Sequence, residues 1–132
     1  MGSIVKVVVA DDDLYVARFI ARVMASLGYC AILCSDGERA LHVLEDNPDA
    51  RLLVTDISMP NMDGRRLLGE LRSRENFKKL PVILTSGLAR VSEIADLLDV
   101  GVTCYLGKPI EVDELRSYAQ NLVQHGTVVA PK

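Results

Sequence analysis

The chain has 132 residues, of which 49% are hydrophobic and 25% are charged, so it fits one globular domain with a sizeable core. Its net charge of -3 and its isoelectric point near 5.3 exclude long-range attraction to nucleic acid or to an anionic membrane. No signal peptide and no apolar run of about 18 residues is present, so we expect a cytoplasmic protein. We expect residues 1–126 to form the domain and residues 127–132 to be a tail or the start of a linker.

The three cysteines, Cys30, Cys34 and Cys104, lack the CxxC spacing of metal sites. Cys30 and Cys34 lie in one predicted strand, where four residues of extension separate them by roughly 13 Å, too far for a disulfide. We therefore expect three reduced cysteines that belong to the core.

Apolar runs that predict strands alternate five times with helical patterns, which is typical of a parallel sheet covered on both faces. The first run, Ile4–Ala10, holds three consecutive valines, as expected of a strand buried on both faces. A predicted helix follows at Leu14–Leu27, and Gly28 ends it. The later units are predicted, each as a strand and then a helix, at Cys30–Cys34 and Gly37–Glu45, Arg51–Thr55 and Gly64–Arg74, Val82–Thr85 and Val91–Val100, and Thr103–Leu106 and Glu111–Gln124.

The spacing of apolar residues predicts which face of each helix turns inward. In the last two helices the predicted inward residues are Val91, Ile94, Ala95, Leu97 and Leu98, and then Val112, Leu115, Ala119 and Leu122. The third helix carries four arginines that we expect to form a solvated outer face: Arg65, Arg66, Arg72 and Arg74.

Chemically versatile side chains follow four of the predicted strands. Asp11 and Asp12 follow the first strand, and Asp56 follows the third. Ser86 follows the fourth strand, and Lys108 follows the fifth. With right-handed crossovers these strand ends meet at one rim, which is where open α/β sheets bind ligands. The five side chains are therefore predicted to form one site.

Three carboxylates at one rim require a cation. Any two of them within about 4 to 5 Å would repel by on the order of 4 kcal/mol at an effective dielectric constant near 20. Hard oxygen ligands in so sparse a set suit Mg²⁺, which keeps several waters and completes its shell with a phosphate oxygen. The sequence therefore predicts Mg²⁺ as the cofactor.

An aspartate can attack phosphorus and form an aspartyl phosphate. A divalent ion and the Lys108 ammonium would neutralise charge on the transferring group, and the Ser86 hydroxyl could donate to one of its oxygens. Each helper alone is a weak signal, because an Asp pair after a strand is often a turn feature and a Lys-Pro pair is often a helix entry. Their joint occurrence predicts a phosphoacceptor switch centred on Asp56.

These residues match the motifs of a known family. The motifs are the acid pair Asp11 and Asp12, the acceptor Asp56 with Met59 and Pro60, the turn Asp63 and Gly64, then Ser86, Tyr105, and Lys108 with Pro109. Over roughly residues 5–123 the chain resembles the receiver domain of two-component response regulators, and it is similar to the single-domain chemotaxis regulators. The resemblance implies a flavodoxin-like, doubly wound α/β fold with five parallel strands in the order 2-1-3-4-5 and five helices.

The resemblance also implies a donor and a metal site. Asp56 would accept a phosphoryl group from a histidine kinase or a histidine phosphotransfer protein. Asp12, Asp56 and the backbone carbonyl of Ser58 would bind Mg²⁺ directly, and Asp11 would act through water.

Further roles follow from the same resemblance. Ser86 and Lys108 would hold the phosphoryl oxygens, and the peptide bond between Lys108 and Pro109 would be cis. On phosphorylation Ser86 would move toward the phosphate and Tyr105 would rotate inward. That change would reshape the surface of the fourth helix, fifth strand and fifth helix, which would contact a downstream effector or an attached output domain.

The remaining expectations concern the lifetime of the phosphate on Asp56, the partners of the domain and its catalytic activity. Ser58 and Leu88 would flank the acceptor and tune how long the phosphate survives. The domain would promote only its own phosphotransfer and autodephosphorylation, so it would be regulatory rather than an enzyme. It would bind no nucleic acid and no membrane directly, and the family allows a dimer that forms on phosphorylation.

Two other functions remain open at this point. One is a Mg²⁺-dependent phosphohydrolase that works through an aspartyl phosphate, although such an enzyme usually carries an acid/base carboxylate where this chain has Ser58. The other is a receiver-like scaffold that no longer takes phosphate. The sequence also leaves open whether the chain stands alone or is cut from a larger protein.

Overall fold

Strands and helices alternate along the chain, as the sequence predicts. The computed structural model describes residues 4–87 and 91–126, so Leu88 and the predicted tail at residues 127–132 lie outside the described residues. Its strands are β1 (Lys6–Ala10), β2 (Cys30–Cys34), β3 (Leu52–Asp56), β4 (Val82–Ser86) and β5 (Cys104–Gly107). Its helices are α1 (Leu14–Ser26), α2 (Gly37–Asp46), α3 (Gly64–Arg72), α4 (Val91–Val100) and α5 (Val112–His125), and a 3-10 helix that we did not predict, η1 (Glu75–Phe77), follows α3.

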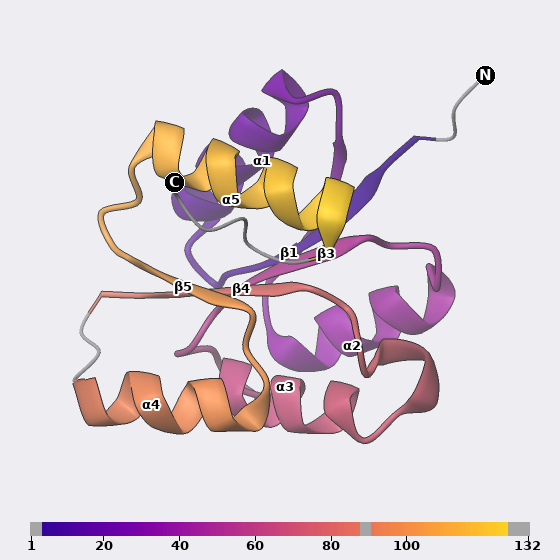
Figure 1. Cartoon of the computed structure of the whole chain (residues 1–132), viewed down its shortest axis with the longest axis vertical. Helices are drawn as coiled ribbons and strands as arrows, with labels where there is room; N and C mark the ends of the chain where they lie inside the picture. The colour runs from indigo at the N-terminus through magenta and orange to yellow at the C-terminus, as the bar shows by residue number, and fades with distance from the viewer. Residues whose placement is uncertain (1–3, 88–90, 127–132) are drawn as a thin grey trace.

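The strands form one parallel sheet in the order β2-β1-β3-β4-β5. Helices α1 and α5 cover one face of the sheet, and α2, α3 and α4 cover the other (Figure 1). This arrangement confirms the predicted flavodoxin-like, doubly wound fold and its strand order. Strand β1 has β2 on one side and β3 on the other, so the winding reverses there and the carboxyl ends of β1 and β3 border the ligand-binding crevice.

The sheet separates two hydrophobic cores within the described residues. Val8 packs in the core that contains the buried residues of α2 and α3, whereas Val7 and Val9 pack in the core that contains those of α1 and α5. All three valines are 0% exposed, as the consecutive valines predicted. Burial on both faces fixes the backbone of β1, and with it the residues at its carboxyl end.

Aspartates begin three of the helices. The side chains of Asp13, Asp36 and Asp63 accept hydrogen bonds from backbone N–H groups in the first turns of α1, α2 and α3. Each anionic cap also complements the positive end of its helix dipole. Asp13, the third acid after β1, is therefore a helix cap, which leaves Asp11 and Asp12 for the rim.

Three residues of the last two helices that were predicted to face inward are exposed. Leu98 is 52% exposed and Val112 is 42% exposed, whereas Leu97 and Leu115 are 1% and 0% exposed. Ala95 is exposed as well. In α4, Ala95 and Leu98 are exposed beside the buried Leu97, so the predicted inward set was too wide there. Val112 is the first residue of α5, and the buried residues of that helix begin at Leu115. The side chains of Val91 and Ile94 lie outside the described part of the chain.

Arg72 does not belong to a solvated arginine face. Its guanidinium donates to the carbonyl of Gly101 from Nε at 3.0 Å and from Nη2 at 2.7 Å, and to the carbonyl of Phe77 from Nη1 at 2.8 Å. Arg65 and Arg66 are exposed as predicted. The helical pattern of α3 could not predict this difference, because the carbonyls that Arg72 binds lie outside α3, at the last residue of η1 and at the residue that follows α4.

Cys30 does not belong to the core. It is exposed at the start of β2, an edge strand, whereas Cys34 and Cys104 are buried as predicted, and all three thiols are free. Strand β2 lacks a second neighbouring strand, so its residues are less covered than those of β1.

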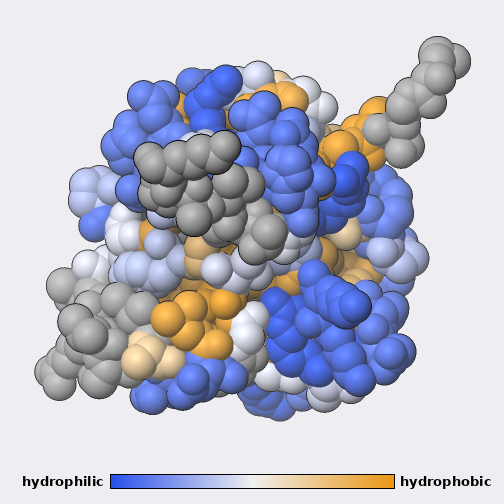
Figure 2. Space-filling model, in the orientation of Figure 1, coloured by the Kyte–Doolittle hydropathy of each residue, from blue (hydrophilic) through white to orange (hydrophobic). Residues whose placement is uncertain are grey.

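On the face of the molecule shown in Figure 2, the helices carry mainly polar residues. On the face in Figure 2 hydrophilic residues dominate the two helical layers, and hydrophobic residues show mainly in the band between them. None of the helices in the described residues combines the length and the apolar character that crossing a bilayer requires.

Candidate functional site

Two buried aspartates lie side by side at the carboxyl end of the sheet. Asp11 directly follows β1, and Asp56 is the last residue of β3, the neighbouring strand. They are 3% and 7% exposed. The backbone N–H of Asp11 donates to the Cys34 carbonyl at 3.0 Å, and Asp56 is in register with Thr85 of β4. Both carboxylates therefore stand on backbone that the sheet holds in place.

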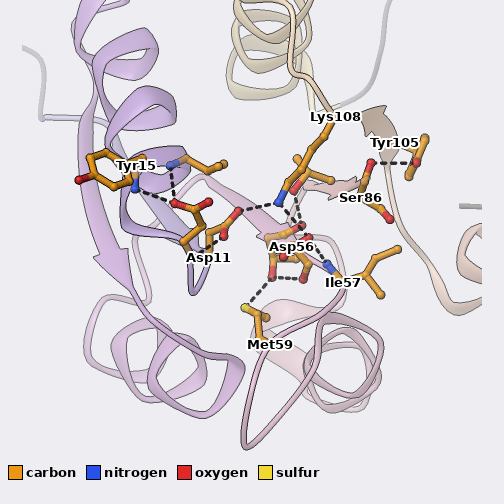
Figure 3. A network of polar contacts seen from close by, with 12 residues as sticks. Asp11, Tyr15, Asp56, Ile57, Met59, Ser86, Tyr105 and Lys108 are labelled. Atoms are coloured by element: carbon orange, nitrogen blue, oxygen red, sulfur yellow. Dashed lines mark hydrogen bonds and ion pairs between the residues drawn. The ribbon is translucent and has the colours of Figure 1, made fainter. Parts of the chain in front are cut away.

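Lys108 connects these two carboxylates. Figure 3 shows its side chain pointing between them, with Nζ 3.2 Å from Asp11 Oδ2 and 3.4 Å from Asp56 Oδ1. Lys108 follows β5, and the peptide bond to Pro109 is cis, as the resemblance implied. Lys108 is thus in direct contact with Asp11, although 97 positions separate the two residues in the sequence.

The side chains of this cluster carry more negative charge than positive charge. Burial raises the pKa of Asp56, the neighbouring Asp11 raises it further, and Lys108 offsets only part of that rise. Burial by itself lowers the pKa of Lys108, but the carboxylates of Asp11 and Asp56 outweigh burial and raise it. The ammonium therefore stays charged, and the carboxylates still lack a full counter-charge.

Asp12 completes a group of oxygen donors that fits a divalent cation. Within the described residues, carboxylate oxygens of Asp11, Asp12 and Asp56 lie within 4.8 Å of one another. Asp12 is exposed, so the group opens to solvent on one side, where water could fill the remaining ligand positions. Mg²⁺ prefers a few anionic oxygen ligands and keeps water at its other ligand positions. The residues present therefore fit this ion.

Ser86 lies at the end of β4, beside the acceptor strand. Its backbone carbonyl accepts a hydrogen bond from the Lys108 N–H at 2.8 Å and another from the Tyr105 hydroxyl at 3.3 Å (Figure 3). Tyr105 is half-buried in β5 and packs against the core on the side of α2 and α3. The predicted switch residues are thus joined through one carbonyl.

Of the two residues that were predicted to tune the phosphate lifetime, the structure describes Ser58. Ser58 lies in the loop between β3 and α3, two residues after Asp56, and its side chain is exposed. Leu88 lies outside the described residues. The structure therefore places Ser58 near the acceptor along the chain and gives no position for Leu88.

Sequence reasoning missed a pocket beside the site. Tyr15, Val16 and Phe19 of α1 face the segment Lys108–Ile110 across a pocket of about 320 Å³ with mostly apolar walls. Tyr15 is 82% exposed at its edge. An exposed aromatic at the start of α1 was the signal that could have indicated it.

The fold and this acidic, lysine-containing crevice define an α/β signalling domain of the doubly wound class. The family model for the response regulator receiver domain matches residues 7–120, and the chain belongs to that family. It is 33% identical over 112 residues to chemotaxis protein CheY1 of Helicobacter pylori, covering 84% of this chain and 90% of CheY1. It is 35% identical over 125 residues to regulatory protein AtoC of Escherichia coli, covering 94% of this chain and 26% of AtoC.

A solved structure agrees on the fold. A putative response regulator from Chloroflexus aurantiacus superposes with a TM-score of 0.86 at 27% identity, covering 93% of this chain and 100% of that one. The chain thus spans about a quarter of one relative, AtoC, and most of another, CheY1. As a receiver domain of two-component signalling, it is a phosphorylation-dependent switch with a regulatory role.

Proposed function

We propose that Asp56 is the phosphoacceptor of this switch and that a histidine kinase or a histidine phosphotransfer protein is the donor. One observation carries the proposal: Lys108 Nζ lies 3.4 Å from Asp56 Oδ1 inside a group of three carboxylates. A nucleophilic carboxylate, a fixed ammonium and a cation-binding acid pair are the parts that phosphoryl transfer requires.

The proposed direct metal ligands are Asp12, Asp56 and the backbone carbonyl of Ser58, and Asp11 is proposed to act through water. Mg²⁺, when bound, would supply positive charge to the phosphoryl oxygens and to the carboxylates around it. The excess of carboxylates over ammonium groups and the mutual proximity of their oxygens support this assignment.

In the proposed transfer an Asp56 carboxylate oxygen forms a bond to phosphorus while the phosphorus–nitrogen bond of a phosphohistidine breaks. The nitrogen keeps the electron pair, and because the other ring nitrogen carries a proton, the histidine leaves as a neutral imidazole. Lys108 would hold one phosphoryl oxygen through its ammonium, and Ser86 would donate to another through its hydroxyl. The domain would later promote hydrolysis of its own acyl phosphate, and Ser58 and Leu88 would set how fast.

The proposed donor surface is the pocket beside Lys108. A protein donor must bring its phosphohistidine to the rim of the sheet, and the apolar pocket between α1 and Lys108–Ile110 adjoins that rim. The exposed ring of Tyr15 offers contact area at the edge of the pocket.

The proposed output is a change of the surface formed by α4, β5 and α5, read by an effector, an attached output domain or a second phosphorylated copy. Tyr105 would transmit the change from Ser86. We place the protein in the cytoplasm, since free thiols are typical of a reducing compartment. We assign residues 1–126 to the receiver domain, which contains the matched range, and residues 127–132 to a tail or linker.

Incubation with acetyl phosphate and Mg²⁺, followed by intact mass spectrometry, tests the proposal. We expect a labile phosphoryl adduct on the wild type and on Asp46→Asn, a matched control at an exposed aspartate, but none on Asp56→Asn. No adduct on the wild type would favour a scaffold, and rapid turnover of added phosphoesters would favour a phosphohydrolase. Either result would contradict the proposed switch.

A further inference from the structure

The loop between β3 and α3 contains a residue in a rare backbone conformation. Asn61 has a φ of 65°, in the left-handed region that asparagine tolerates better than most residues. In this conformation its side-chain nitrogen donates a hydrogen bond of 2.7 Å to Asp36 Oδ2. The loop that follows the acceptor is thus tied to a residue outside the site.

Asp36 uses both of its carboxylate oxygens. Oδ1 accepts from the backbone N–H of Arg39 at 2.8 Å and so caps α2, while Oδ2 accepts from Asn61. These hydrogen bonds, the one from Arg39 first, hold the pKa of Asp36 below its usual value. The carboxylate therefore stays ionised at neutral pH, and its hydrogen bond to Asn61 is charge-assisted.

The next residue in each segment adds a close backbone contact. The N–H of Gly37 donates to the carbonyl of Met62 at 3.0 Å. A Cβ at position 37 would lie 2.4 Å from that carbonyl oxygen, so only glycine permits this approach. Asp36, Gly37, Asn61 and Met62 together form what we call the α2 clamp.

The base of the same loop is fixed against the acceptor. The N–H of Gly64 donates to the carbonyl of Ile57 at 2.8 Å, and a Cβ on Gly64 would lie 2.3 Å from the Asp56 carbonyl oxygen. The N–H of Ile57 donates to Asp56 Oδ1 at 2.9 Å (Figure 3). Residues 58–60 therefore span a gap between two fixed points, the base of the loop and the α2 clamp.

We propose that Asp36 and Asn61 are positioning residues that hold this loop so that the Ser58 carbonyl faces the cation. The inference rests on the proposed function, because Ser58 is a proposed ligand of Mg²⁺. A backbone carbonyl cannot be aimed by a rotamer of its own, so its direction depends on where the chain on either side is held. The clamp holds one side, and Asp56 with Ile57 and Gly64 holds the other.

Calorimetric titration with Mg²⁺, without any phosphodonor, tests the inference in the full chain. In Asn61→Asp the left-handed backbone remains accessible, but two carboxylates face each other. We expect Mg²⁺ binding to weaken about fivefold, less than the roughly 10- to 100-fold typical for a supporting partner of a metal ligand, because this pair is exposed to water.

The double variant Asp36→Asn with Asn61→Asp exchanges donor and acceptor and restores the wild-type net charge. The asparagine introduced at position 36 can donate to the carboxylate introduced at position 61 and still cap α2 through its own carbonyl oxygen. We expect the affinity of this variant for Mg²⁺ to return to within about twofold of wild type, since one polar contact replaces another. Asn61→Gly, which keeps the backbone conformation but lacks the amide, should bind Mg²⁺ as weakly as Asn61→Asp.

Asn76→Asp, at an exposed position in η1, controls for an added negative charge and should leave Mg²⁺ binding unchanged. Wild-type affinity in both Asn61 variants, or a double variant as weak as Asn61→Asp, would overturn the positioning role. A wild type that binds no Mg²⁺ and takes up no phosphoryl group would instead contradict the proposed function itself.

Discussion

The hydroxyl of Tyr105 donates a hydrogen bond of 3.3 Å to the backbone carbonyl of Ser86. The same carbonyl accepts the backbone N–H of Lys108, so the end of β4 is bonded both to the ring of Tyr105 and to the residue that contacts Asp56. A displacement of the Ser86 backbone toward a phosphoryl group would therefore act directly on its bond to Tyr105. The hydrogen bond between Tyr105 and Ser86 therefore defines the unphosphorylated state of the proposed switch.

Tyr105→Phe removes this hydroxyl and keeps the ring. We expect the free energy of unfolding to fall by about 0.5 to 1 kcal/mol, the usual net value of one hydrogen bond at a half-buried position. Urea unfolding measures this change. Tyr15→Phe, at an 82% exposed ring, is the control and should leave stability unchanged. A Tyr105→Phe variant as stable as wild type would show that the bond to Ser86 contributes nothing in solution.

Mg²⁺ should stabilise the fold, because a folded acid cluster binds it and an unfolded chain does not. At a hundredfold excess over Kd the expected gain is about 2.7 kcal/mol, which raises the Tm by several degrees. Calorimetric scans with Mg²⁺ and with EDTA measure the shift. Asp12→Asn, at an exposed position, should fold normally and show a much smaller shift. Equal shifts in the two proteins would remove Asp12 from the ligand set.

Lys108→Met separates metal binding from phosphoryl transfer. Removal of the ammonium that contacts Asp11 and Asp56 leaves their charge uncompensated, so Mg²⁺ should bind about tenfold more tightly, while uptake of phosphate from acetyl phosphate slows. Titration calorimetry and adduct formation measure the two effects. Lys78→Met, whose ion pair with Glu75 is exposed, is the control. A loss of both properties together would indicate that Lys108 only supports the fold.

Arg72→Met should destabilise the protein by about 2 to 3 kcal/mol, because its charged guanidinium satisfies the carbonyls of Gly101 and Phe77 and methionine donates to neither. Urea unfolding measures the loss. Arg65→Met, an exposed position of the same helix, should change stability by less than about 0.5 kcal/mol. Similar stabilities for the two variants would show that the hydrogen bonds of Arg72 to these two carbonyls contribute nothing in solution.

The three thiols should differ in reactivity. Burial raises the pKa of Cys34 to about 11 and of Cys104 to about 12, from the usual 9.0, so both stay protonated near neutral pH. Since the folded-state pKa lies above the unfolded value, their stabilising contribution is complete below about pH 9 and is lost as the pH rises toward 11 and 12. At pH 8, iodoacetamide should modify Cys30 first, as followed by peptide mass mapping. Equally fast labelling of Cys104 would contradict its burial.

The sequence predicted the strands and the rim well because both depend on local patterns. Three consecutive valines indicate a strand that is buried on both faces of a parallel sheet. The aspartates that follow them therefore mark the end of the strand. The structure brings Asp11, Asp56 and Lys108 into contact as those strand ends predicted. The bounds of the predicted strands and helices differ from the observed ones by at most two residues, because hydrogen bonds at the ends of an element decide them.

Other features depend on partners that are distant in the sequence, so local patterns could not predict them. Nothing near Arg72 indicates that the Gly101 carbonyl reaches it, and nothing in α4 indicates that Leu98 stays exposed while Leu97 is buried. The contact between Asn61 and Asp36 joins two loops, each of which alone has the pattern of an ordinary turn. Pairing of this kind is determined by the packing of α2 beside α3.

The strand order also sets when the charges of the site meet during synthesis. β1 and β3, which carry Asp11 and Asp56, leave the ribosome early and pair with each other in the middle of the sheet. β5 is the last strand to be made and lies at the edge of the sheet, so the chain contains both aspartates before it contains Lys108. The charge balance of the site is therefore complete only when β5 has joined the sheet, because the carboxylates of Asp11 and Asp56 lie in earlier parts of the chain than the ammonium that contacts them.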